Sequence, residues 1–183
     1  MNEDNKADWA MRTVVIIAII LAAAALRIAP HPWNFTPIGA MALFSGAMLP
    51  KRWTKFALPL AALFAGDLFI GFHELMPVVY ASFLVSVLIG TWLEKRRSVG
   101  RIAGATVLGA VQFYLVTNFA VWAAMTTYPK TAAGLGACYT AGIPFFWNSL
   151  AADAVYAALL FGGFALAERM IPELRERASV PGR

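Results

Sequence analysis

The sequence contains few charged side chains for its length, which excludes an ordinary soluble domain. Of its 183 residues, 14% are charged and 60% are hydrophobic, and the mean hydropathy is +0.66. Soluble globular domains carry about 25% charged residues. The composition therefore predicts an all-α integral membrane protein with no separate soluble domain. The net charge of +5 needs no nucleic-acid partner, because basic loops can face the anionic headgroups of the lipid bilayer.

The residues and motifs of several common chemistries are also scarce. A single cysteine, Cys138, excludes an internal disulfide, and with only two histidines beside it no His and Cys zinc site can be assembled. The chain contains no G-x-x-x-x-G-K-[ST] phosphate loop and no G-x-S-x-G nucleophile motif. We therefore expect no enzyme activity, no cofactor and no ATPase of its own.

Long apolar runs predict a bundle of six transmembrane helices in a single membrane domain, residues 1–183. A span needs about 20 residues, and several runs are shorter, so that tilt or snorkelling must complete them. Pro129, Gly134, Gly136 and Gly142 interrupt the longest outer connection, which favours a lid-like segment there. The helices are expected over about 13–29, 35–49, 56–72, 77–94, 102–125 and 144–169, with the lid-like segment over 126–142.

The basic residues predict the orientation in the membrane. In the six-span arrangement thirteen of the 15 Lys and Arg fall on one side, and only Arg27 and Lys130 fall on the other. Because cationic loops mark the cytoplasmic side, we expect the inner (plasma) membrane with both termini in the cytoplasm. A cleaved signal peptide ending in the alanine-rich stretch 21–26 is the alternative, although Glu3, Asp4 and Asp8 are atypical of a basic leader.

Strongly polar side chains within the predicted spans lie mainly in their outer halves. A carboxylate at the bilayer centre costs about 2.5–3.5 kcal/mol, so Asp67 and Asp153 should face protein or water and usually serve a function. The structural alternative is that one of them pairs with Arg27 or caps a broken helix. Small polar residues such as Asn118 can also simply hold helices together. The predicted ligand-binding residues are Asn34, Thr36, Asp67, His73, Asn118, Tyr128, Cys138, Tyr139, Trp147, Asn148 and Asp153.

The stretch H-P-W-N-F-T-P before the second span predicts a rigid polar rim. Pro37 suits a first helical turn, which makes Thr36 the expected N-cap and leaves Asn34 just outside. The positive end of the helix dipole would favour an anionic or acceptor-rich ligand group there. A simple capped helix start is the alternative.

The lid-like segment carries aromatic residues and the lone cysteine. Tyr128, Tyr139 and Trp147 could stack on a flat ligand. Cys138 is either a small apolar filler or a soft sulfur that faces the ligand, including a metal-containing one such as a cobalamin.

Ala18 and Ala22 form a small-xxx-small pair in the alanine-rich first helix. Such pairs let another helix approach closely. The helix could be one of this bundle or one of a partner protein.

Together, the blocks H-P-W-N-F-T-P-I-G-A, V-T-N-F-A-V-W and Y-P-K-T-A-A-G-L-G-A-C-Y-T-A-G-I-P-F-F-W-N-S-L-A-A-D resemble an uncharacterised bacterial family of small membrane proteins labelled as candidate transporters. The six-span architecture is more distantly similar to the S-components of energy-coupling-factor (ECF) vitamin transporters. That resemblance implies uptake of a vitamin-like or cofactor-like small molecule from an outward-facing cavity. It also implies docking of an ECF coupling subunit on Ala18 and Ala22, with separate ATPases. The alternatives are a proton-coupled transporter that uses both aspartates and a structural membrane subunit.

Overall fold

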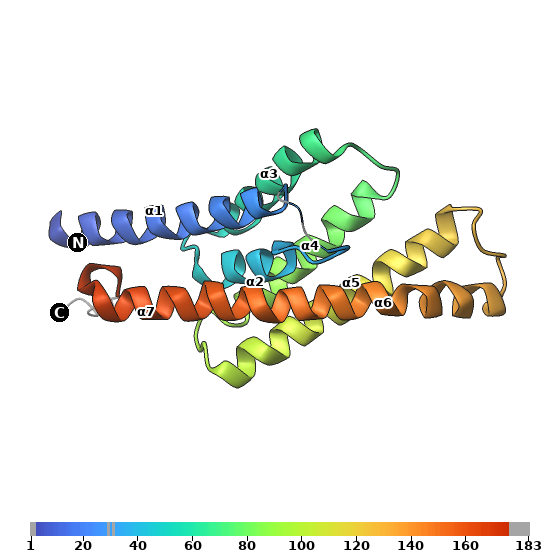
Figure 1. Ribbon diagram of the computed structural model, residues 1–183. Coiled ribbons are helices and arrows are strands. Elements are labelled where there is room, and N and C mark those ends of the chain that lie inside the picture. Colours follow the sequence, from blue (N-terminus) through green and yellow to red (C-terminus); the bar gives the residue numbers. More distant parts are fainter. Residues whose placement is uncertain (1–2, 29, 31, 176–183) are drawn as a thin grey trace.

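A computed structural model describes residues 3–28, 30 and 32–175, and every regular element in these residues is helical (Figure 1). His31 lies outside the described residues. The elements are α1 (Glu3–Leu26), α2 (Ile38–Met48), α3 (Arg52–Ile70), α4 (Met76–Thr91), α5 (Val99–Ala124), α6 (Ala132–Ala157), the π-helix η1 (Ala158–Gly162), α7 (Gly163–Met170) and the 3-10 turn η2 (Pro172–Leu174). The predicted all-α class is confirmed.

Four helical stretches among the described residues are long and apolar enough to cross a membrane. They are Ala7–Ala25, Arg52–Ile70, Val99–Ala124 and the continuous rod Ala132–Met170. The other two apolar helices, α2 and α4, are shorter. Long apolar helices of this kind indicate a membrane protein.

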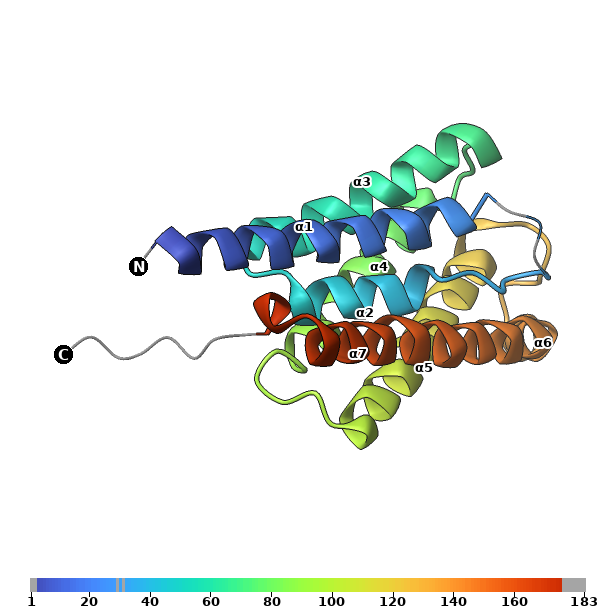
Figure 2. The ribbon, with the colours of Figure 1, turned by 60° about the vertical axis from the view of Figure 1, so that its left-hand side comes forward.

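Helix α2 lies at the centre of the bundle and is too short to span a bilayer. Its 11 residues rise about 16 Å, whereas a hydrocarbon core is about 30 Å thick. Figure 2 shows it between α1 and α3 on one side and α6 and α7 on the other, and all its residues except Gly39 are buried. The ring of Phe44 packs against Phe161 and Phe164 at centroid distances of 5.2 and 5.9 Å. A helix this short could lie within a membrane only where protein surrounds it, as protein surrounds α2.

Two glycines allow α2 and α4 to cross at backbone distance. A Cβ on Gly46 would overlap the carbonyl oxygen of Val87, and a Cβ on Gly90 would overlap that of Leu43. Small residues permit this approach between membrane helices. The crossing fixes where α2 lies and therefore where its first turn lies.

Residues 126–142, expected as a lid, are mostly helix. Helix α6 begins at Ala132, where the Thr131 hydroxyl accepts a bond from the Gly134 N–H at 3.1 Å. Gly134 and Gly142 serve close packing: a Cβ on Gly134 would overlap the Pro129 carbonyl, and one on Gly142 would lie 2.5 Å from Oδ1 of Asn118. The non-helical connection is limited to residues 125–131, and α5 and α6 form a hairpin that extends past the other helices (Figure 1).

The basic loops meet at one end of the bundle. We call this the inner end; it holds the start of α1, the α2–α3 and α4–α5 connections and the end of α7 (Figure 1). Ion pairs join its elements, Arg12 to Glu168 at 2.5 Å and Lys55 to Glu94 at 2.8 Å. The opposite, outer end holds Arg27 and Lys130. The charge asymmetry of the sequence is therefore also an asymmetry of the fold.

Candidate functional site

Two adjoining cavities lie beside the first turn of α2, toward the outer end. The larger measures about 340 Å³ and the smaller about 160 Å³. Both are lined by Asn34, Ala110, Phe113 and Ser149. The larger also contacts Arg27, Thr36, Phe83 and Asp153, and the smaller also contacts Asn118 and Gly142. We refer to the pair as the outer cavity.

Asp153 connects α6 to the start of α2 at the wall of the outer cavity. Its Oδ1 accepts a hydrogen bond from the Ala40 N–H at 3.0 Å, and the residue is 8% exposed. Gly39 makes room for it, since a Cβ there would overlap the carboxylate. The N-cap residue of α2 is Pro37, which has no capping side chain, so the prediction of Thr36 as N-cap is wrong. Asp153 supplies the acceptor instead, as the structural alternative for this residue expected.

Asp67 lies behind Arg27. Its Oδ1 is 2.6 Å from Nη2 of Arg27, and its Oδ2 accepts a 2.6 Å hydrogen bond from the Tyr80 hydroxyl. Nη1 of Arg27 also donates to the Leu63 carbonyl at 2.9 Å, and the guanidinium rests against Gly66. Asp67 itself does not line the outer cavity; Arg27 does. The carboxylate therefore orients the cation that faces the cavity.

The rim segment before α2 is held by α6. Asn34 adopts a left-handed backbone with φ of 58°, which Asn tolerates better than most residues. The Ser149 hydroxyl donates to the Asn34 carbonyl at 3.5 Å, and Nδ2 of Asn148 donates to the Trp33 carbonyl at 3.1 Å. These contacts hold the segment where Asn34 lines both parts of the outer cavity.

The remaining predicted residues divide between helix packing and the surface. Buried Cys138 donates to the Asn118 carbonyl at 3.3 Å, and the Tyr139 ring packs on Tyr114 at 5.6 Å, so both residues join α6 to α5. Asn118 lines the smaller cavity, and its Nδ2 donates to the Tyr114 carbonyl at 2.9 Å. Three further predicted residues, His73, Tyr128 and Trp147, line neither part of the outer cavity.

Sequence reasoning missed several polar groups near the cavity. Arg27 was considered only in the charge asymmetry and as a partner for an aspartate, although an arginine at the outer end was itself a signal. Gln112 is a lone amide in an apolar run; its Nε2 donates to the Ser82 carbonyl at 3.0 Å and to the Ser86 hydroxyl at 3.1 Å. Ser86 lines the larger cavity. Gln112 thereby fixes α4 to α5 beside the site.

The outer cavity can recognise a ligand through several kinds of group. It combines a carboxylate, a guanidinium, hydroxyls and amides with the phenyl rings of Phe83 and Phe113. Ligand pockets typically show such a pattern, with a few polar groups in a largely apolar lining.

The described residues thus form an all-helical bundle that has helices long and apolar enough to cross a membrane and a polar cavity among them. The chain belongs to a family of unknown function, DUF6580, which matches residues 7–174. Comparison with curated proteins and with solved structures found no match.

Proposed function

We propose that this protein is a membrane transport protein that binds a small molecule in the outer cavity as the first step of uptake. The observation that carries the proposal is the placement of Asp153 and Arg27 at a cavity among apolar helices. Ionisable residues inside a membrane are costly and usually mark a substrate or ion pathway.

The lining supports a ligand of the vitamin or cofactor-like class. A volume of about 340 Å³ suits a molecule at the small end of the usual ligand range, which is roughly 300–1,000 Å³. Phe83 and Phe113 would pack against an aromatic or heteroaromatic ring. Asp153 would accept bonds from donors on the ligand, and Arg27 would donate to its acceptors.

The S-component resemblance is part of the proposal. Ala18 and Ala22 lie on the exposed face of α1, whereas Ile16, Ile20 and Ala23 are buried against the bundle. The alanine pair is therefore available to a helix of a coupling subunit, and separate ATPases would supply the energy. Helices α1 to α6 alternate in direction (Figure 1), which supports six passes with the short, buried α2 enclosed by the others.

The alternatives have less support in the contacts. A proton relay through both aspartates would need to release Asp67 from Arg27 and Tyr80. A purely structural role would not require a cavity lined by polar side chains.

The proposal includes the orientation of the chain, which follows from the basic inner end. In a Cys138→Ala background, a cysteine at Lys95 is expected to stay unlabelled by a membrane-impermeant maleimide in intact cells, and one at Thr127 is expected to react. Lysed cells should label both. Labelling of Lys95→Cys in intact cells would show the opposite orientation.

The binding step is tested by mass spectrometry of small molecules that remain with the purified protein. We expect one vitamin-sized molecule per chain in the wild type and its loss in Asn34→Gly, because glycine keeps the left-handed backbone and removes only the side chain. Thr13→Ala is the matched control, since its hydroxyl bonds to the Trp9 carbonyl near the inner end. If Asn34→Gly and the wild type retain the same amount of the small molecule, Asn34 is not part of the binding site.

A further inference from the structure

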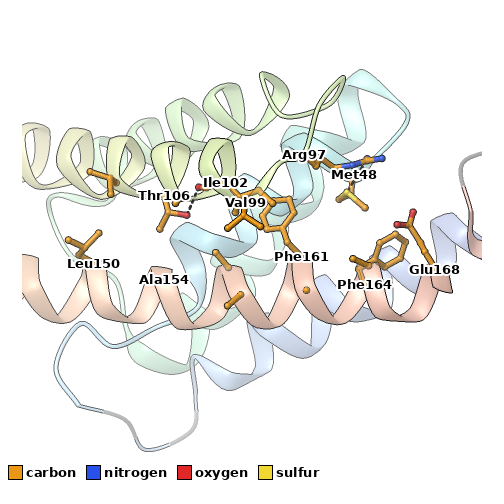
Figure 3. Close-up of a pocket in the computed structure, with 16 residues that line it drawn as sticks. Met48, Arg97, Val99, Ile102, Thr106, Leu150, Ala154, Phe161, Phe164 and Glu168 are labelled. Carbon is orange, nitrogen blue, oxygen red and sulfur yellow. Dashed lines mark hydrogen bonds between the residues drawn. The ribbon is translucent and has the colours of Figure 1, made fainter. Parts of the chain in front are cut away.

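A second, larger hollow begins beside the outer cavity, where the two have neighbouring lining residues on α5 and α6, and extends toward the inner end. It measures about 580 Å³ and separates the first turns of α5 from the rod formed by α6, η1 and α7. Figure 3 shows Val99 and Ile102 of α5 and Leu150, Ala154 and Phe161 of the rod around the same space. We call it the inner groove. Toward the outer end α5 packs on α6 through Tyr114, Tyr139 and Phe146, whereas Figure 1 shows the first turns of α5 lying apart from the rod at the inner end.

The walls of the inner groove are suited to hydrocarbon. Small residues of the rod, including Ala154, Ala158 and Gly162, line the groove and leave space between the rod and α5. The hydroxyl of Thr106 already donates to the Ile102 carbonyl at 2.9 Å, as the dashed line in Figure 3 marks. The walls between the two helices therefore present aliphatic and aromatic surface, which an apolar chain can cover without leaving a polar group unsatisfied.

Basic side chains surround the inner end of the groove. A neighbouring hollow is lined by Arg97, Ala165, Glu168, Arg169 and Arg175, and it shares Arg97, Ala165 and Glu168 with the groove. Glu168 is paired with Arg12 at 2.5 Å, so its negative charge is already compensated. Arg175 donates from Nε to the Glu168 carbonyl at 2.8 Å and from Nη2 to the Arg169 carbonyl at 3.0 Å, which holds it at the end of α7. The mouth of the groove is therefore cationic.

We propose that the inner groove binds one acyl chain of an anionic phospholipid, whose phosphate lies against Arg97, Arg169 and Arg175. Leu150 and Ala165, near the two ends of the groove, are separated by about 22 Å of helix. That length covers the roughly 15 Å depth of one leaflet. The mouth lies at the same end as the basic loops, where a cytoplasmic leaflet rich in anionic lipid would meet it. An apolar groove that ends in arginines matches a phospholipid better than it matches a free anion, which would use only the mouth.

The lipid is tested by native mass spectrometry of delipidated protein titrated with dioleoyl phosphatidylglycerol or dioleoyl phosphatidylcholine. The wild type is expected to bind one phosphatidylglycerol more tightly than phosphatidylcholine. Arg169→Gln should weaken phosphatidylglycerol about fivefold, the contribution of one basic residue near an anionic surface. Arg52→Gln is the control, because Arg52 is exposed at the inner end outside the mouth.

Filling the groove gives an independent readout. Gly162 lines the groove and Gly163 does not, and a Cβ at either position would meet no neighbouring atom. Gly162→Leu is therefore expected to fold like Gly163→Leu, as their unfolding temperatures in lipid-free detergent will show, and to lose the bound lipid that Gly163→Leu keeps. Equal binding of the two lipids by the wild type, or unchanged binding by Gly162→Leu, would overturn the proposal. The proposal would also be overturned if a co-purified protein helix occupied the groove in place of the lipid and was lost in Gly162→Leu.

Discussion

Gly90→Ala is expected to destabilise the protein severely, although it adds only one methyl group. The new Cβ would overlap the Leu43 carbonyl of α2, and α2 cannot easily move away because it is buried among the other helices. Overpacking typically costs about 1–3 kcal/mol, and a clash with rigid backbone belongs at or above the upper limit. The effect is measured as a lower unfolding temperature in detergent, with size-exclusion chromatography as the readout of folded protein.

Gly104→Ala is the matched control for this substitution. Gly104 lies within α5, and a Cβ there would meet no neighbouring atom. Since alanine favours a helix by about 1 kcal/mol over glycine, Gly104→Ala should be neutral or stabilising. If the two variants unfold at the same temperature, the close crossing of α2 and α4 is not present in the protein.

Asp67→Leu is expected to cost about 3–5 kcal/mol of folding free energy, the usual loss when one partner of a buried ion pair is removed. The Arg27 side chain is only 15% exposed, and it would lose its carboxylate partner. The hydroxyl of Tyr80 would lose its acceptor as well. Chemical or thermal unfolding of the single variant measures this loss.

The double variant Arg27→Met with Asp67→Leu should recover most of the stability, because replacing a buried pair with apolar residues is often neutral. Arg101→Met with Asp67→Leu should not, since Arg101 lies over the Trp92 ring and not near Asp67. The rescued protein should nevertheless fail to retain ligand, because it lacks the guanidinium of Arg27. Full ligand retention by the rescued variant would make the pair purely structural.

The sequence predicted the helical class because apolar runs and charge asymmetry are local properties of the chain. It did not predict the start of α2, since the acceptor for the first turn comes from Asp153, 113 residues from Ala40, whose N–H it binds. It misread Gly134 and Gly142 as helix breakers, because local sequence does not distinguish a glycine that interrupts a helix from one that lets another segment pack closely.

Part of the candidate site could also be predicted from local properties of the sequence. Asn34, Thr36 and Asp153 meet at the larger cavity, since each is polar at an outer helix end or within a span. Cys138 and Tyr139 were grouped with them by chain proximity, but helical geometry turns both toward α5. The pairing of an aspartate with Arg27 was one of the alternatives that the sequence suggested, and Asp67 makes it. The position of Arg27 at the cavity was not predicted, because it depends on how the end of α1 packs against α3.

The most direct test of the proposed function is the ligand occupancy of Asp153→Asn, measured by native mass spectrometry of protein purified in mild detergent. Asparagine keeps a carbonyl oxygen for the Ala40 N–H, so the first turn of α2 should stay capped while the charge that faces the ligand is removed. Glu94→Gln is the control, because it removes an acidic group that pairs with Lys55 at the inner end. Our account predicts one small molecule bound to the wild type and to Glu94→Gln, and little or none bound to Asp153→Asn. A wild type that carries no small molecule, or an Asp153→Asn variant that carries as much as the wild type, would contradict it.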